Sequence, residues 1–222
     1  MIRAVGFDLD NTLYDQAQHV FPFFSAAAAQ IGRETGLEPT ILENTFREAW
    51  HALGPSHPKL FDAILDKHAI LDAQRVRMLV RMYHGHVSPL EAYPGVKLLL
   101  ERLSGRFPLF LITNGNMAMQ RRKIECLGIG PLFRVVVFSA EDGPGFQKPH
   151  SAPFLRALNL LQRAPGECIF VGDNPGCDVA GAARAGMKTV RVLTGPFRAK
   201  ASVGIEPDFT VDSVSVIENV LG

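Results

Sequence analysis

The chain has 222 residues, enough for one large domain or for a medium-sized domain with a smaller one. Hydrophobic residues make up 47% of it and charged residues 20%, as in an ordinary soluble globular protein. Its 23 basic and 22 acidic residues leave a net charge of +1. The composition therefore offers no electrostatic basis for a nucleic-acid partner or for binding a membrane surface.

The N-terminal region and the cysteines bear on where the protein works. The chain opens with a strand-like run that ends in acidic residues, so we expect no signal peptide. The longest early apolar stretch, residues 20–29, is too short to span a bilayer. Cys126, Cys168 and Cys177 are odd in number and lack metal-ligand spacing, which favours a reducing, cytoplasmic location. No feature of the sequence indicates an oligomeric state.

The first predicted element is a short apolar strand at residues 2–7, which ends in Asp8 and Asp10 and then in the turn signal Asn11-Thr12. An ionised carboxylate at the end of a buried strand is costly unless something compensates its charge. Two such carboxylates, one residue apart, predict a nearby cation.

The segment that follows, residues 16–90, has apolar residues at helical spacing and no strand pattern. Glycine and proline interrupt it at intervals. We predict four helices there, at 19–33, 40–53, 60–68 and 73–87.

From residue 93 onward, short apolar strands alternate with helices. The predicted strands are 108–112, 135–138, 168–171, 189–193 and 208–211, and the predicted helices are 95–103, 117–127, 151–161, 179–185 and 213–221. This alternation indicates βαβ units and a parallel sheet covered on both faces. The strand at 2–7 has no nearby partner, so it must join this block. We predict an α/β core of residues 1–15 and 91–222 with a helical cap, residues 16–90, inserted into it.

Polar residues and one glycine follow four of the predicted strands or their loops. They are Asp8, Asp10, Thr113, Asn114, Gly115, Lys148, Asp173 and Asp178. In a parallel sheet the carboxyl ends of the strands converge on one crevice. Four aspartates and one lysine carry a charge of −3, and each pair of like charges at ~4 Å repels by roughly 4 kcal/mol at a dielectric constant near 20. A divalent cation would compensate this charge, and oxygen ligands favour Mg²⁺.

The same residues suit phosphoryl transfer. Asp8 could attack phosphorus and form an aspartyl phosphate, while Asp10 protonates the leaving oxygen and later deprotonates water. Thr113 and the backbone N–H groups of the Asn114-Gly115 turn would bind phosphate oxygens. Lys148 would hold the nucleophile and the phosphoryl group. Asp173 would bind the metal, and Asp178 would bind it or orient a ligand.

Four stretches resemble the motifs of the haloacid dehalogenase superfamily, in their usual order. They are Asp8-Leu9-Asp10-Asn11-Thr12-Leu13, Ile112-Thr113-Asn114-Gly115, Lys148-Pro149 and Gly172-Asp173-Asn174-Pro175-Gly176-Cys177-Asp178. The resemblance covers the α/β core and implies a Rossmann-like sheet, Mg²⁺ and an aspartyl-enzyme intermediate. It also implies that the metal is held by the side chain of Asp8, the main-chain carbonyl of Asp10 and Asp173. The helical insertion matches the helical-cap branch of the family.

Asp10 separates two branches of that family, because the dehalogenases that resemble this chain lack the second aspartate. We therefore predict a Mg²⁺-dependent phosphatase acting on a small phosphorylated metabolite, such as a nucleotide, a sugar phosphate or a glycolate-sized phosphate. A phosphomutase, a 2-haloacid dehalogenase-like hydrolase, a phospho-receiver domain and a non-catalytic binding protein remain alternatives. Asn11 stands where glycine is common in the family.

Other conspicuous residues receive structural interpretations. The pair His84 and His86 has no third ligand in sight, and His150 is expected to cap the next helix. The basic run Arg121-Arg122-Lys123 is predicted to be a solvated helix face, and the aromatic cluster of Phe21, Phe23 and Phe24 is predicted to be core rather than a substrate pocket. Tyr14 could belong to either core or pocket.

Overall fold

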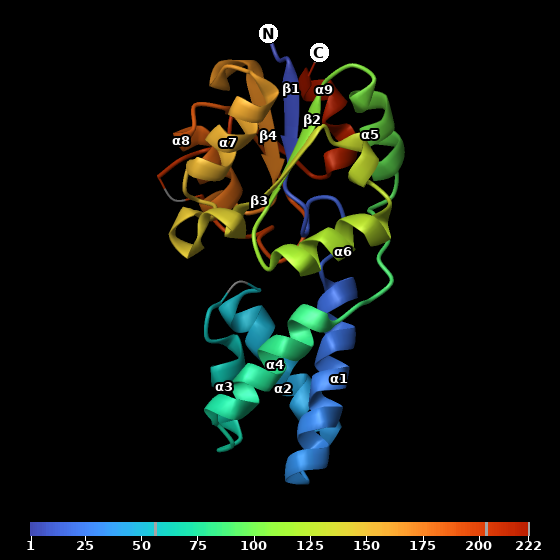
Figure 1. Cartoon of the computed structure of the whole chain (residues 1–222), viewed down its shortest axis with the longest axis vertical. Coiled ribbons are helices and arrows are strands. Elements are labelled where there is room, and N and C mark those ends of the chain that lie inside the picture. Colours follow the sequence, from blue (N-terminus) through green and yellow to red (C-terminus); the bar gives the residue numbers. More distant parts are fainter. Residues whose placement is uncertain (56, 203, 222) are drawn as a thin grey trace. The chain divides into compact units, whose positions relative to one another are not determined.

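The structure of the protein, a computed structural model, describes residues 1–55, 57–202 and 204–221. The chain divides into two compact units, one of residues 1–16 with 90–222 and one of residues 17–89 (Figure 1). The division predicted from the sequence differs from this one by a single residue at each junction. Each unit has a hydrophobic core of its own.

The first unit is built on a six-stranded sheet with the strand order β3-β2-β1-β4-β5-β6. Each neighbouring pair of strands is parallel. The strands are β1 (Ala4–Phe7), β2 (Leu109–Thr113), β3 (Val135–Phe138), β4 (Cys168–Gly172), β5 (Lys188–Val192) and β6 (Phe209–Val211). The N-terminal strand β1 lies between β2 and β4, so its carboxyl end is central in the sheet.

Helices cover both faces of this sheet, because alternate residues of each strand point to opposite sides. Phe7 of β1 packs in the cluster that includes α5 (Val96–Ser104). Phe170 of β4 packs in the other cluster, with α7 (Ala152–Leu161) and α8 (Ala180–Arg184). Figure 1 shows α5 and α7 on opposite sides of the sheet. The predicted fold class, a Rossmann-like parallel α/β sheet flanked by helices with a helical insertion, is confirmed.

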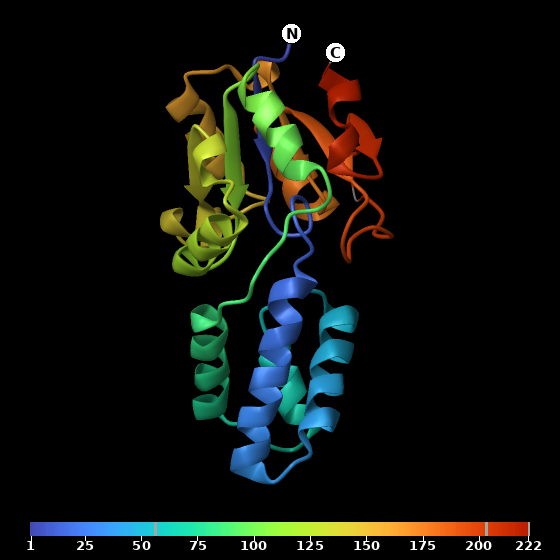
Figure 2. The same cartoon turned by 90° about the vertical axis from the view of Figure 1, so that its right-hand side faces the viewer.

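The second unit contains four helices within its described residues. They are α1 (Ala17–Thr35), α2 (Pro39–Leu53), α3 (Leu60–Lys67) and α4 (Ala73–Gly85), and Figure 2 shows α1 beside α2 and α4. Phe23 and Phe24 of α1 are buried in the core of this unit, as predicted. Phe21 is half-buried, and the guanidinium of Arg47 lies 4.1 Å from the centroid of its ring.

Two predicted helices near the C-terminus differ from the structure. The helix predicted at 179–185 is preceded by a π-helical turn (Pro175–Val179), and α8 begins only afterwards. Asn174 explains the turn, because its side chain accepts the Gly176 N–H at 3.0 Å while its carbonyl accepts the Asp178 N–H at 2.8 Å. The helix predicted at 213–221 is broken into a 3₁₀ turn (Val214–Val216) and α9 (Glu218–Leu221).

Candidate active site

Asp8 and Lys148 are at the centre of the candidate site. Asp8 directly follows β1, and Lys148 comes from the loop between β3 and α7, yet Lys148 Nζ lies 2.5 Å from Asp8 Oδ1. The same ammonium lies 2.7 Å from Asp178 Oδ1 and donates to the carbonyl of Ile112 at 3.0 Å. Burial alone would lower the pKa of Lys148, but the charges of Asp178 and Asp8 outweigh burial and raise it. Lys148 is therefore a buried cation with three acceptors.

Three carboxylates, those of Asp8, Asp173 and Asp178, gather at the ends of β1 and β4. Each offers one oxygen, and these oxygens all lie within 4.8 Å of one another. Asp178 fits here because Gly172 has no side chain, since a Cβ at Gly172 would stand 2.4 Å from the Cβ of Asp178. The Thr12 hydroxyl donates to Asp8 Oδ2 at 3.1 Å. The pairing of β1 with β4 thus brings together three of the four aspartates singled out in the sequence.

This carboxylate cluster is costly to ionise without a cation. Burial, followed by the charge of Asp178, raises the pKa of Asp8 to about 7, although Lys148 opposes the shift. Burial and the charges of Asp178 and Asp8 raise the pKa of Asp173 well above its ordinary value. Asp173 Oδ2 is buried and has no hydrogen-bond partner within the described part of the chain. An unpartnered buried oxygen beside two further carboxylates fits a divalent cation, and donors that are all oxygen fit Mg²⁺.

Asp10 lies outside the carboxylate cluster and is held by side chains of its own. Its Oδ1 accepts hydrogen bonds from the Tyr14 hydroxyl and, at 2.6 Å, from Lys123 Nζ. Its Oδ2 accepts from Gln120 Nε2 at 2.7 Å. Burial alone would raise the pKa of Asp10, but the charge of Lys123 and these three hydrogen bonds lower it. Tyr14, which the sequence left between core and pocket, is fully buried beside Asp10.

Lys123 corrects one prediction from the sequence. The run Arg121-Arg122-Lys123 was expected to be solvated, but the Lys123 side chain is only 3% exposed. The buried face of α6 (Met117–Leu127) includes Gln120, Lys123, Ile124 and Leu127, at the helical spacing i, i+3, i+4 and i+7. This spacing was the available signal, and the charge of Lys123 concealed it.

The Thr113-Asn114-Gly115 turn follows β2. Thr113 is buried, and its Oγ1 accepts a hydrogen bond from the same Gln120 amide that donates to Asp10. The Asn114 side chain binds the main chain of Lys148, since its Nδ2 donates to the carbonyl at 3.0 Å and its Oδ1 accepts the amide N–H at 3.1 Å. Gly115 has a φ of 109°, which glycine adopts readily. Phosphate binding by the backbone of this turn stays a prediction.

Two of the histidines singled out in the sequence make local hydrogen bonds. His150 Nδ1 accepts the Ala152 N–H at 3.0 Å, so this residue caps the start of α7 as predicted. His86 Nε2 lies 2.7 Å from Ser88 Oγ.

Within the described residues, Asp8, Asp173 and Asp178 make up the one group of three or more side chains arranged for a metal ion. Among the described helices, none has the length and apolar character needed to cross a bilayer.

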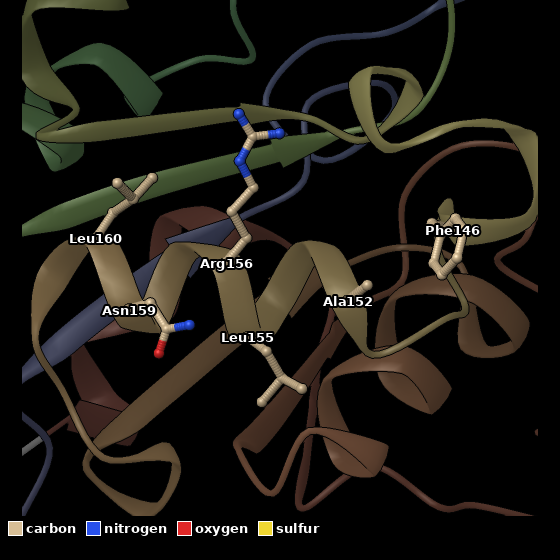
Figure 3. A pocket seen from close by; sticks show the side chains of 6 residues that line it. All are labelled: Phe146, Ala152, Leu155, Arg156, Asn159 and Leu160. Carbon is tan, nitrogen blue, oxygen red and sulfur yellow. The ribbon is translucent and has the colours of Figure 1, made fainter.

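A pocket of about 610 Å³ lies along the outer side of α7 (Figure 3). Its lining residues are Phe146, Ala152, Leu155, Arg156, Asn159 and Leu160. The Arg156 guanidinium lies 2.8 Å from Glu141. None of the site residues predicted from the sequence lines this pocket, so it is a separate surface feature.

Comparison with known proteins supports the chemistry suggested by the site. A family model described as haloacid dehalogenase-like hydrolase matches residues 2–186. The glyceraldehyde 3-phosphate phosphatase of Methanopyrus kandleri is 34% identical over 220 residues, which cover 96% of this chain and 94% of that protein. The phosphoglycolate phosphatase of Aquifex aeolicus is 27% identical over 225 residues, which cover 98% of each chain.

Solved structures agree at the level of the fold. A putative HAD hydrolase from Bacillus subtilis, solved with bound magnesium, has a TM-score of 0.69 and 20% sequence identity, and the match covers 99% of this chain and 98% of that one. The resemblance predicted from the four motifs is thereby confirmed, as is the predicted class of enzyme, a phosphatase-type hydrolase.

Proposed function

We propose a specific reaction for this chain, which belongs to the haloacid dehalogenase-like hydrolase family: the Mg²⁺-dependent hydrolysis of small phosphomonoesters through an aspartyl phosphate. One observation carries this proposal. Asp8 lies in contact with the Lys148 ammonium and within a cluster of three carboxylates, while Asp10 stands apart in a separate set of hydrogen bonds. Two neighbouring aspartates in such different surroundings suit two different roles.

In the first half of the reaction, an Asp8 carboxylate oxygen attacks phosphorus, and the bond from phosphorus to the leaving oxygen breaks. Because its pKa is lowered, Asp10 must first take up a proton, and it then gives this proton to the leaving oxygen, so the product leaves as an alcohol. In the second half, Asp10 takes a proton from water, the hydroxide oxygen bonds to phosphorus, and the bond to Asp8 breaks to release phosphate. Lys148 and Thr113 offset negative charge on the phosphoryl oxygens.

The side chains of Asp8 and Asp173 and the main-chain carbonyl of Asp10 would hold the Mg²⁺ ion, and Asp178 would bind it or orient a ligand. When bound, the ion supplies positive charge that lets the phosphate dianion approach a carboxylate-rich site. The chain's own contribution is the fixed position of Asp8, which Lys148 and the Thr12 hydroxyl secure through its two oxygens.

The substrate class is a phosphate ester of a small alcohol. The relatives named glyceraldehyde 3-phosphate phosphatase and phosphoglycolate phosphatase support two- and three-carbon phosphates as first candidates. Residues 17–89 would act as the cap that selects the leaving group, as in the helical-cap branch that this chain resembles.

Phosphate release from a panel of substrates tests the proposal. The purified protein with Mg²⁺ is expected to hydrolyse p-nitrophenyl phosphate, glyceraldehyde 3-phosphate or phosphoglycolate, and the Asp8→Asn variant is expected to lose turnover. Asp212→Asn, which changes an exposed aspartate of the same unit, is the matched control. Acid-quenched wild-type enzyme should carry labelled phosphate on Asp8. Full turnover by Asp8→Asn would refute the nucleophile, and chloride release from 2-chloropropionate without phosphatase activity would favour the dehalogenase alternative.

A further inference from the structure

We propose that Lys123 and Gln120 of α6 are positioning residues that fix the Asp10 carboxylate so that its Oδ2 is the oxygen that exchanges protons with the substrate and with water. This inference rests on the proposed function, because it assigns to one oxygen the acid–base role given to Asp10. Neither residue belongs to the four motifs that carry the family resemblance. The sequence predicted a solvated position for Lys123 and did not single out Gln120.

The two oxygens of Asp10 differ in how many hydrogen bonds they accept. Oδ1 accepts two, from the Tyr14 hydroxyl and from Lys123 Nζ at 2.6 Å. Among the residues that the structure describes, Oδ2 accepts one, from Gln120 Nε2 at 2.7 Å. Because each carboxylate oxygen has two lone pairs, these contacts fill Oδ1 and leave one lone pair of Oδ2 available. That lone pair is where a proton can be held and delivered.

Gln120 connects Asp10 to the second motif. Its Nε2 donates to Asp10 Oδ2 and also to Thr113 Oγ1. One amide therefore sets the distance between the Asp10 carboxylate and the Thr113 hydroxyl, which is predicted to bind phosphate. Gln120 Oε1 is buried and has no hydrogen-bond partner among the described residues. The amide is therefore oriented by its two donor contacts, and both of these are to site residues.

Lys123 neutralises Asp10 separately from the Asp8 pair. Its ammonium is buried and lies against Asp10, whereas the Lys148 ammonium lies against Asp8 and Asp178. A buried lysine is costly unless it is paired, and an apolar residue would complete the buried face of α6 without that cost. Lys123 is thus better explained by what it does to Asp10 than by packing.

The role predicts an effect that depends on the leaving group. An alkoxide leaves poorly without a proton, whereas p-nitrophenolate leaves without one, so only alkyl phosphates need Asp10 in the first step. Both substrates need Asp10 to activate water in the second step. Displacing Asp10 should therefore slow both steps for an alkyl phosphate but only the second step for p-nitrophenyl phosphate. A phosphoenzyme should consequently accumulate from p-nitrophenyl phosphate.

The experiment uses Lys123→Met and Gln120→Met in the full-length protein with Mg²⁺, with the exposed Lys97→Met as control. For glyceraldehyde 3-phosphate or phosphoglycolate, whichever the wild type hydrolyses, kcat should fall roughly 10–100-fold with KM changed less than threefold, as expected for partial loss of a ~10²–10⁴-fold acid–base contribution. With p-nitrophenyl phosphate, rapid mixing should show a burst of p-nitrophenol that the wild type lacks. Lys97→Met should match the wild type.

A double-mutant cycle separates positioning from general damage. If Lys123 acts through Asp10, then adding Lys123→Met to Asp10→Asn should change kcat by less than threefold. Equal losses on both substrates with no burst, or a full further loss in the Asp10→Asn background, would overturn the inference. Should Lys123→Met melt at a much lower temperature, Gln120→Met, which removes no charge, carries the same test. Wild-type protein that releases no phosphate from any ester would instead refute the proposed function itself.

Discussion

The Asn114 carboxamide binds both polar groups of the Lys148 main chain, donating to its carbonyl at 3.0 Å and accepting its N–H at 3.1 Å. The Ser139 hydroxyl donates to Asn114 Oδ1 at 2.6 Å and to the carbonyl of Thr113 at 3.1 Å. These contacts attach the loop before α7, which is rich in glycine, to the end of β2. They explain how Lys148 can be held accurately although it follows a loop made of two short 3₁₀ turns, Ser139–Asp142 and Pro144–Phe146.

Replacing Asn114 with alanine should therefore impair catalysis through the position of Lys148. Two hydrogen bonds to the Lys148 main chain are lost, and a displacement of about 1 Å in a catalytic group can reduce the rate on the order of 10²-fold. We expect kcat for p-nitrophenyl phosphate to fall on the order of 10- to 100-fold. Steady-state kinetics of Asn114→Ala beside Asn159→Ala, which changes a surface asparagine of α7, measures the effect. Equal activity of the two variants would show that the carboxamide does not set the position of Lys148.

Asp173 is predicted to reduce the stability of the metal-free protein. Its Oδ2 is buried without a partner within the described residues, and burial and the neighbouring carboxylates raise its pKa. Asp173→Asn removes this buried charge with little change of shape, so at pH 8 the metal-free variant should be more stable than wild type by about 0.5–2 kcal/mol. Urea denaturation in EDTA measures the difference.

The same substitution should weaken Mg²⁺ binding, which isothermal titration calorimetry measures. Stability gained together with affinity lost is the outcome expected of a site that a cation completes. A less stable Asp173→Asn variant would mean that Asp173 makes stabilising contacts in the absence of metal.

Much of the site could be predicted because it lies at strand ends. The apolar runs located β1, β2 and β4, and a parallel sheet brings its carboxyl ends together whatever the loops do. Asp8, Asp173 and Asp178 therefore came together as the residues that follow those strands. The connection of β1 to the later strands could likewise be inferred, because a lone strand needs a partner.

Contacts between side chains distant in sequence could not be read in this way. Gln120 and Lys123 stand 110 and 113 positions from Asp10, and only the packing of α6 reveals that they share its carboxylate. Charge outweighed helical spacing in the interpretation of Lys123, because buried lysines are rare. The attachment of Asn114 to Lys148, 34 positions away, carries no periodic signal either.

The backbone conformation of Asn11 explains why asparagine can stand where glycine is common in the family. Its φ is 63°, in the left-handed region where glycine and asparagine are the residues best tolerated. Its side chain also accepts the Gln16 N–H at 3.1 Å and donates to Gln16 Oε1 at 3.2 Å. We expect Asn11→Ala to lower the free energy of unfolding by about 1–3 kcal/mol, since it adds backbone strain and loses both hydrogen bonds.

Asn11→Gly separates these two causes, because glycine adopts the same φ without strain. It should cost less than Asn11→Ala, with the remaining loss due to the hydrogen bonds to Gln16. Midpoints of urea denaturation with unchanged slopes would give both values. Equal destabilisation by alanine and glycine would show that strain contributes nothing at this position.

The effect of Mg²⁺ on stability should depend on pH in a direction set by Asp8. Its pKa is raised to about 7 in the folded protein by burial and by Asp178, against about 3.9 in an unfolded chain. Between about pH 4 and pH 7 the folded state therefore binds more protons, so this group lowers the free energy of unfolding as pH rises. Mg²⁺ competes with those protons and should bind more tightly at pH 7.5 than at pH 5.5.

The melting temperature should thus rise more on adding Mg²⁺ at pH 7.5 than at pH 5.5. At pH 7.5 the free energy of unfolding should increase by about 2.7 kcal/mol when Mg²⁺ is a hundredfold above its Kd. Differential scanning fluorimetry with and without Mg²⁺ at both pH values measures this. Asp173→Asn, which loses a ligand and one of the groups with a raised pKa, should show a small shift that hardly changes with pH. A shift in wild type that is equal at both pH values would mean that the ion does not displace protons from Asp8 and Asp173, and that it binds elsewhere.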